Sequence, residues 1–183
     1  MSIVTHHRFS VAAYHRMLAE GILTEDDPVE LIRGEVIEKM PVGATHAATV
    51  KRLNRLFAGT ESVIVSVQDP IIMDDSEPEP DLALLRYRDD FYASQKPTAT
   101  DVQLLIEVAD SSLAYDREVK LPLYATAGIA EVWIVNLIEA QVEIFREPKP
   151  VGRYGARTVA VKGEYVPLPT DPARSVPIEQ ILP

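Results

Sequence analysis

The chain contains no cysteine. This absence excludes disulfides, thiolate zinc sites and cysteine nucleophiles, so any bound metal is expected to be held by oxygen or imidazole ligands. No run of about 18 or more apolar residues occurs, and Thr5-His6-His7-Arg8 stands where a signal peptide would need an apolar segment. We therefore expect a soluble, cytoplasmic protein with no membrane segment.

Basic residues are also few, because 18 Lys and Arg stand against 28 Asp and Glu, for a formal net charge of −10. A negative field repels the phosphate backbone of nucleic acids at long range. Clustered acids neutralised by a divalent ion would offset this repulsion, as would a local basic patch of Lys51, Arg52 and Arg55. The composition thus argues against a nucleic-acid partner without excluding one.

Size and hydrophobicity are those of one globular domain over residues 1–183, with 46% hydrophobic and 25% charged residues. Ser10 is expected to cap a helix over 11–20 that Gly21 closes. Strands at 29–32 and 35–40 flank Arg33-Gly34, which predicts a hairpin. Thr45 is expected to cap a second helix over 46–57, whose apolar residues follow the spacing of one face.

Strand patterns dominate the rest of the chain. We expect strands at 62–67, 70–73, 82–85, 102–108, 132–135 and 141–145, and short ones near 158–161 and 164–166. A loop is predicted at 86–101, and a helix at 115–127 that ends at Gly128.

Two carboxylates interrupt apolar runs on different predicted strands. They are Asp81, in Glu79-Pro80-Asp81, and Glu107, in Leu104-Leu105-Ile106-Glu107-Val108. A carboxylate in such a run is costly to desolvate unless a cation, a hydrogen-bond donor or a cleft receives it. Chance burial explains one such residue better than two.

The helix that follows carries Asp116, Lys120 and Tyr124 at i, i+4 and i+8, so the three share one face. From position alone, Asp116 and Lys120 are better explained as a surface ion pair. The strand before the helix favours a different position for Lys120, because a strand that runs into this helix would bring Lys120 near Glu107. Asp81, Glu107 and Lys120 would then form a metal-dependent nuclease site, with two carboxylates for magnesium and a lysine that orients or deprotonates the attacking water.

An ordered series of motifs resembles a known family. It comprises Glu30 to Met40 with His46, Glu79 to Ala83, Leu105 to Val108, Asp116 to Lys120 with Tyr124, and Gly128 to Val135. The series resembles the PD-(D/E)XK, or restriction-endonuclease-like, superfamily and within it the Uma-two family of endonucleases.

The resemblance implies a restriction-endonuclease-like α/β core, a mixed β-sheet flanked by helices with an N-terminal helix and β-hairpin. It also implies cleavage of DNA with magnesium or manganese, with Asp81 and Glu107 as metal ligands on adjacent strands. Ala109 stands where the superfamily expects its lysine, which points to Lys120 on the next helix. Glu35 of the hairpin becomes a third candidate, as a water-mediated metal partner or as a solvent-facing strand residue. A homodimer is expected, because superfamily enzymes that cut both strands pair two sites.

Other features leave alternatives open. The segment Asp110-Ser111-Ser112 and Asn136 depart from the family pattern. We interpret His46 as a partly exposed helix-end residue rather than a cleft contact, Gln68 as solvated, and Trp133 as core. The alternatives to a nuclease are a catalytically degenerate member that binds nucleic acid or protein, and an unrelated α/β binding domain in which the two acids are structural. The second would be supported if Asp81 and Glu107 lay far apart.

Overall fold

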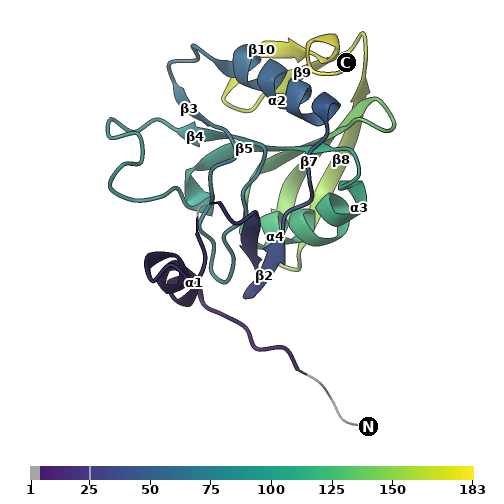
Figure 1. Ribbon diagram of the computed structural model, residues 1–183. Coiled ribbons are helices and arrows are strands. Elements are labelled where there is room, and N and C mark those ends of the chain that lie inside the picture. Colours follow the sequence, from purple (N-terminus) through teal and green to yellow (C-terminus); the bar gives the residue numbers. More distant parts are fainter. Residues whose placement is uncertain (1–4, 25) are drawn as a thin grey trace.

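The computed structural model describes residues 5–24 and 26–183 and is built around a six-stranded mixed sheet (Figure 1). The strand order is β3-β4-β5-β6-β7-β8, and only β5 and β6 pair in parallel. The strands are β3 (Val63–Ser66), β4 (Leu82–Arg86), β5 (Val102–Ala109), β6 (Glu131–Asn136), β7 (Gln141–Lys149) and β8 (Arg153–Val161). Within the described residues, no helix is long and apolar enough to span a membrane. The predicted α/β class with a mixed sheet flanked by helices is confirmed.

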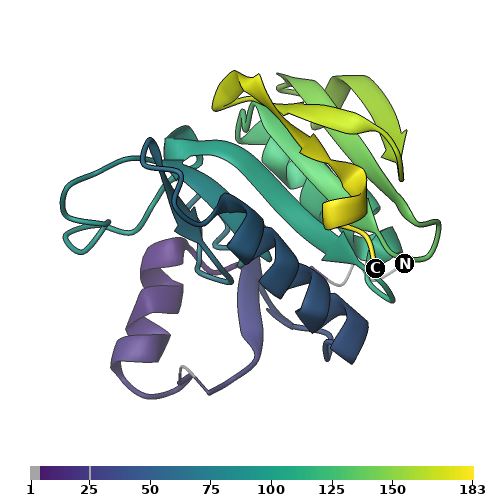
Figure 2. The same ribbon diagram turned by 90° about the horizontal axis from the view of Figure 1, so that it is seen from above.

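One face of the sheet is covered by α2 (Ala44–Phe57) and by the antiparallel pair of β9 (Tyr165–Leu168) and β10 (Asp171–Pro177). Figure 2 shows α2 and this pair over the same face, and Arg174 of β10 donates to the Leu56 carbonyl of α2 at 3.0 Å. The core on this side joins Leu53 and Phe57 to Ile106 and Trp133. Trp133 is therefore core, as predicted.

The other face is covered by the connection between β5 and β6 and by the hairpin of β1 (Val29–Ile32) and β2 (Glu35–Glu38), with α1 (Val11–Ala19) outside it (Figure 1). Side chains alternate along a strand. In β5, Ile106 and Val108 thus face α2, whereas Leu105 and Ala109 belong to the second core. Glu107 points to this second side, where the site lies.

The connection from β5 to β6 is helical but not uniformly α-helical. It runs through α3 (Leu113–Tyr115), a π-helical turn η2 (Asp116–Lys120) and α4 (Leu121–Thr126). The Leu121 N–H donates to the Asp116 carbonyl, five residues back. Pro122 has no N–H to give to the carbonyl four residues back and would clash with it, so a widened turn fits the sequence here. Such turns are frequent at functional sites.

Several predicted elements are confirmed. Ser10 caps α1, with the Ala13 N–H 3.2 Å from its Oγ, and the hairpin turns at Arg33-Gly34, both with positive φ. Others are wrong. Gly43, not Thr45, is the N-cap of α2, and β10 was not predicted, because its prolines obscure the strand pattern.

No strand forms at 70–73. The N–H groups of Ile71 and Met73 instead donate to the carbonyls of Pro78 and Ser76, so the segment folds back on itself. The Ile72 N–H donates to the Pro97 carbonyl at 2.9 Å, so the segment is held by its own loop and by a single bridge, and the sheet gains no strand from it.

The hairpin turn yields a stability prediction. Gly34 has φ +77°, and a Cβ there would lie 2.8 Å from Arg8 Cβ and 2.9 Å from the Phe9 carbonyl oxygen. Gly34→Ala should lower the free energy of unfolding by about 1–2 kcal/mol for the left-handed backbone and by roughly 1–3 kcal/mol more for the clash. Urea denaturation measures this change.

Gly59→Ala is the matched control, because Gly59 has φ +81° and no atom within 4 Å of the added Cβ. Gly59→Ala should lower the free energy of unfolding by only the contribution of the left-handed backbone, about 1–2 kcal/mol. Equal losses in the two variants would show that the contact with the N-terminal segment does not constrain the turn.

Candidate active site

Asp81 and Glu107 lie side by side. The antiparallel pairing of β4 with β5 sets Leu82 opposite Ile106, so the preceding Asp81 falls next to Glu107. The Val108 N–H donates to Asp81 Oδ2 at 2.8 Å, and the Asp81 N–H lies 3.4 Å from Glu107 Oε2. Asp81 is only 9% exposed to solvent and Glu107 only 3%. The interpretation in which these acids lie far apart is therefore wrong.

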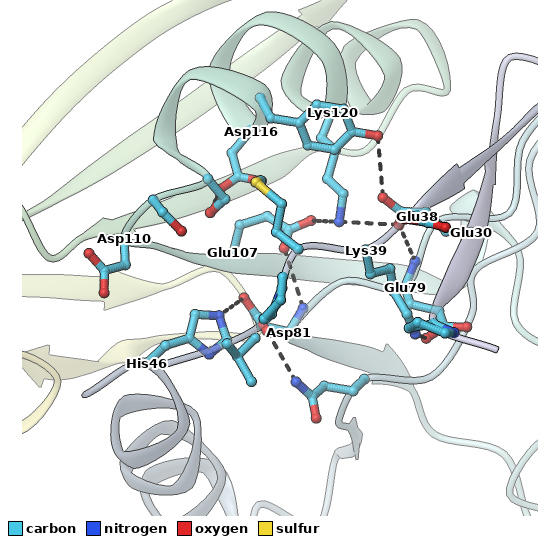
Figure 3. A pocket seen from close by; sticks show the side chains of 18 of the residues that line it. Glu30, Glu38, Lys39, His46, Glu79, Asp81, Glu107, Asp110, Asp116 and Lys120 are labelled. Atoms are coloured by element: carbon cyan, nitrogen blue, oxygen red, sulfur yellow. Dashed lines mark hydrogen bonds and ion pairs between the residues drawn. The ribbon is translucent and has the colours of Figure 1, made fainter. Parts of the chain in front are cut away.

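Lys120 lies in the same cluster. Its Nζ is 3.3 Å from Glu107 Oε1 and 3.3 Å from Glu30 Oε2 (Figure 3). Asp116, on the same π-helical turn, is buried as well, and its carboxylate accepts a hydrogen bond from Ser112 at 2.6 Å. The sequence interpretation of Asp116 and Lys120 as a surface ion pair is wrong, because both are buried.

The structure does not bring Glu35 into this cluster. Glu35 starts β2 beside the turn, its side chain is 36% exposed, and its carboxylate lies 3.7 Å from the Arg8 guanidinium. The hairpin register pairs Ile37 with Glu30, so Glu35 lies two residues, or about 7 Å, nearer the turn.

Glu30 occupies the place that was expected for Glu35. It is buried, and its carboxylate accepts hydrogen bonds from Tyr115 Oη at 3.3 Å and from the Glu79 N–H at 3.2 Å, besides its contact with Lys120. Sequence reasoning missed Glu30, although a signal exists: it is an acid between the apolar Val29 and Leu31, the same feature that singled out Asp81 and Glu107.

His46 and Gln68 also belong to the site, contrary to the sequence interpretation. His46 is buried, and its Nε2 lies 3.0 Å from Asp81 Oδ2, while Gln68 Nε2 donates to Asp81 Oδ1 at 3.4 Å. His46 precedes Val50 by four residues and therefore continues the buried face of α2, a signal that the spacing contained. Gln68 has φ +56°, and nothing in its local sequence indicates that conformation.

Tyr124 holds the second acid. Its hydroxyl donates a hydrogen bond to Glu107 Oε1, and its ring is fully buried. The predicted shared face of Asp116, Lys120 and Tyr124 is thus the face that meets Glu107. Asn136 lies outside the cluster and donates instead to Glu139 and Glu143, both at 3.0 Å.

Burial controls the protonation of this cluster. Burial raises the pKa of Glu107 to about 8, although the charge of Lys120 opposes the shift. Burial also raises the pKa of Asp116 to about 6. For Lys120, burial alone would lower the pKa, but the charges of Glu107 and Glu30 outweigh it and raise the pKa above its ordinary value. Lys120 is therefore cationic at neutral pH, among acids that together exceed its charge.

These residues line a cavity of about 780 Å³ (Figure 3). Figure 3 shows Lys120 pointing down from its helix toward Glu107 and Glu30, with His46 reaching Asp81 from the opposite side. The hairpin, α2, the start of β4, the end of β5 and the π-helical turn all contribute to the lining. Side chains from residues 28–46, 68, 79–81 and 107–120 thus meet at one site.

The donor chemistry of the cavity fits magnesium or manganese. Among the described residues, no group of three or more His, Cys, Asp or Glu is arranged to hold a metal ion by itself. Magnesium needs no such group, because it commonly keeps several waters and is bound through one or two carboxylates plus substrate phosphate. Asp81 and Glu107 would supply those carboxylates, and a divalent charge would offset the surplus of buried acid.

The raised pKa of Glu107 predicts a pH dependence of stability in metal-free protein. A carboxyl whose pKa rises from 4.5 to about 8 on folding contributes stability below pH 4.5 that is lost as the pH rises through 8. In EDTA, raising the pH from about 5 to about 8 should therefore lower the unfolding free energy of the natural protein relative to that of Glu107→Gln. The change in this difference should be on the order of a few kcal/mol.

Glu118→Gln is the control, since Glu118 is exposed on the same π-helical turn. Its difference from the natural protein should stay constant with pH. Unfolding free energies are measured by urea denaturation at each pH. If those of Glu107→Gln and the natural protein changed in parallel with pH, the raised pKa of Glu107 would be contradicted.

Comparison with known proteins supports the fold. Among solved structures, the chain is similar to a crystal structure of a "putative nuclease belonging to DUF820" from Anabaena variabilis ATCC 29413, with a TM-score of 0.69 and 16% identity over 94% of this chain and 97% of that one. At this identity the likeness shows the fold. No curated protein matches the chain significantly.

A family model gives the assignment. Residues 11–179 match the model of the Uma2 family, whose description is "Putative restriction endonuclease". The match covers most of the chain and every segment that forms the cavity. The protein therefore belongs to the Uma2 family of restriction-endonuclease-like proteins.

Proposed function

We propose that this chain is a divalent-metal-dependent endonuclease that hydrolyses DNA phosphodiester bonds, acting as one domain over residues 1–183 with magnesium or manganese. The observation that carries the proposal is the contact of Lys120 with Glu107 at 3.3 Å, beside Asp81 on the neighbouring strand. Two carboxylates and one ammonium group in a single cavity are the groups that phosphodiester hydrolysis needs.

Asp81 and Glu107 would hold the metal, which when bound supplies positive charge and Lewis-acid polarisation of the phosphodiester. His46 and Gln68 orient the Asp81 carboxylate through their hydrogen bonds to its two oxygens. Tyr124 fixes Glu107 in the same way. Partners of this kind hold a ligand in its binding geometry.

Lys120 acts as a cation in this proposal. Because its pKa is raised, it keeps its proton at neutral pH and orients a water or a phosphate oxygen rather than taking a proton from it. Glu30 holds the ammonium group from the hairpin side. The ammonium group is thereby kept between the carboxylates of Glu30 and Glu107, within the cavity.

The proposal includes a homodimer. Among the described residues, β8 has a sheet neighbour on one side only, and the side chains of Val159 and Val161 are about two fifths exposed. An unpaired strand edge of nine residues can pair with a second copy. Light scattering of the purified protein tests this part.

A degenerate binding module is the second candidate, and the acid surplus favours it. The net charge of −10 opposes phosphate binding, and the buried acids remain a binding site even without turnover. This alternative predicts partner binding without cleavage under any divalent ion.

The main test combines metal binding with cleavage. Asp81→Asn and Glu107→Gln should each weaken manganese binding, followed by electron paramagnetic resonance, and should lower the rate of DNA cleavage at least about 100-fold, because each removes a charged ligand. Glu118→Gln, on the exposed side of the same turn, should leave both unchanged. Cleavage that survives both site variants, or that needs no divalent ion, would contradict the proposal.

A second test separates the two hairpin acids. Glu30→Gln removes a negative partner of Lys120 and should lower the cleavage rate by roughly 10- to 100-fold, in the range found for groups that position a ligand. Glu35→Gln should leave the rate unchanged, because Glu35 pairs with Arg8 outside the cavity. The reverse order of effects would restore Glu35 as the functional residue.

A further inference from the structure

The mouth of the cavity is apolar on one side. The segment Met40–Gly43 links β2 to α2 and lines the cavity together with Pro28 and Ile37. Met40 is 43% exposed and Val42 is 58% exposed. Exposed apolar side chains that line a concave site with a few polar groups are typical of a ligand contact.

An aromatic ring lines the same cavity. Tyr115 belongs to the lining, and its hydroxyl is held by Glu30 at 3.3 Å, so the position of its ring is fixed. Neither the salt bridges of the site nor the proposed metal ligands use this ring or the side chains of Met40 and Val42. Aromatic and apolar surfaces of this kind stack or pack on a nucleobase whichever of the four bases it is.

The charge of the lining limits which nucleic acid can enter. Both lysines of the lining are already engaged, Lys39 by Glu79 and Lys120 by Glu30 and Glu107. The acids outnumber them, and they are Glu30, Glu38, Glu79, Asp81, Glu107, Asp110 and Asp116. A duplex carries one phosphate charge per about 1.7 Å of its axis, so this acidic lining repels it, whereas a single inserted nucleotide brings one phosphate to the metal position.

The depth of the acids points the same way. Asp81 and Glu107 are almost fully buried at the floor of the cavity, so a phosphodiester reaches them only by entering it. Enzymes whose target base lies in a recessed pocket act on single strands or on nucleotides extruded from a duplex, and the depth of this cavity asks for the same access.

We propose that the apolar mouth, formed by Met40, Val42 and the ring of Tyr115, binds the nucleobase beside the cleaved bond. The substrate is then single-stranded or locally unpaired DNA rather than an intact duplex. This inference rests on the proposed function, because it places the base next to the proposed metal ligands.

The test uses one DNA sequence in three forms: a single strand, a perfect duplex and a duplex with an unpaired bulge, each labelled with fluorescein. Fluorescence anisotropy in magnesium should show the single strand and the bulged duplex binding at least about tenfold tighter than the perfect duplex. The double variant Met40→Ser/Val42→Ser should weaken binding of the single strand by roughly tenfold. Its control, Ile22→Ser/Val151→Ser, changes two still more exposed apolar residues outside the cavity and should bind as the natural protein does.

Equal affinity for the perfect duplex would overturn the inference, as would equal affinity of the two double variants for the single strand. Cleavage of the same DNAs keeps this result separate from the proposed function. Selective binding without cleavage supports the base site and contradicts the nuclease. Metal-dependent cleavage of the perfect duplex at the rate of the single strand supports the nuclease and contradicts the base site.

Discussion

The antiparallel pairing of β4 with β5 is the constraint on which the site depends. It places Asp81 beside Glu107, and the hydrogen bond from the Val108 N–H to Asp81 Oδ2 fixes the two strands at this level. A shift of one residue would turn either acid to the opposite face, into the core beneath α2. Because both acids face the helical connection, Lys120 and Tyr124 can reach Glu107 from the other layer.

The helical connection completes the site through an irregular turn. Pro122 is incompatible with an uninterrupted α-helix, and the π-helical turn that precedes it carries both Asp116 and Lys120. On its other side, Arg117 of the same turn binds the buried Glu143 of β7, which also accepts from Asn136 and from Arg157. The turn is thereby held to the sheet on one side while it presents Lys120 to the carboxylates on the other.

Sequence patterns predicted the strands and helices that bear the site because each has a clear apolar period. They failed where tertiary contacts outweigh local preference. The segment 70–73 has strand composition, yet its N–H groups donate to loop carbonyls at Pro78, Ser76 and Pro97 rather than to a strand of the sheet. Glu30 and Glu35 share one face of the hairpin, and only the packing of Tyr115 and Lys120 against one end selects Glu30. The contact of His46 with the site was not predicted, because its partner, Asp81, lies 35 residues away in the sequence.

The sequence by itself determined the acids, the lysine on a helix and the family pattern, since apolar periodicity and a charge within an apolar run are local properties of the chain. The tertiary structure decided which acid of the hairpin joins the cluster, that His46 and Gln68 hold Asp81, and that an apolar mouth lies over the carboxylates. These are contacts between segments distant in sequence, fixed by strand register and packing. The fold likewise sets the charge of the site, because burial raises the pKa of Glu107 and the neighbouring acids raise the pKa of Lys120.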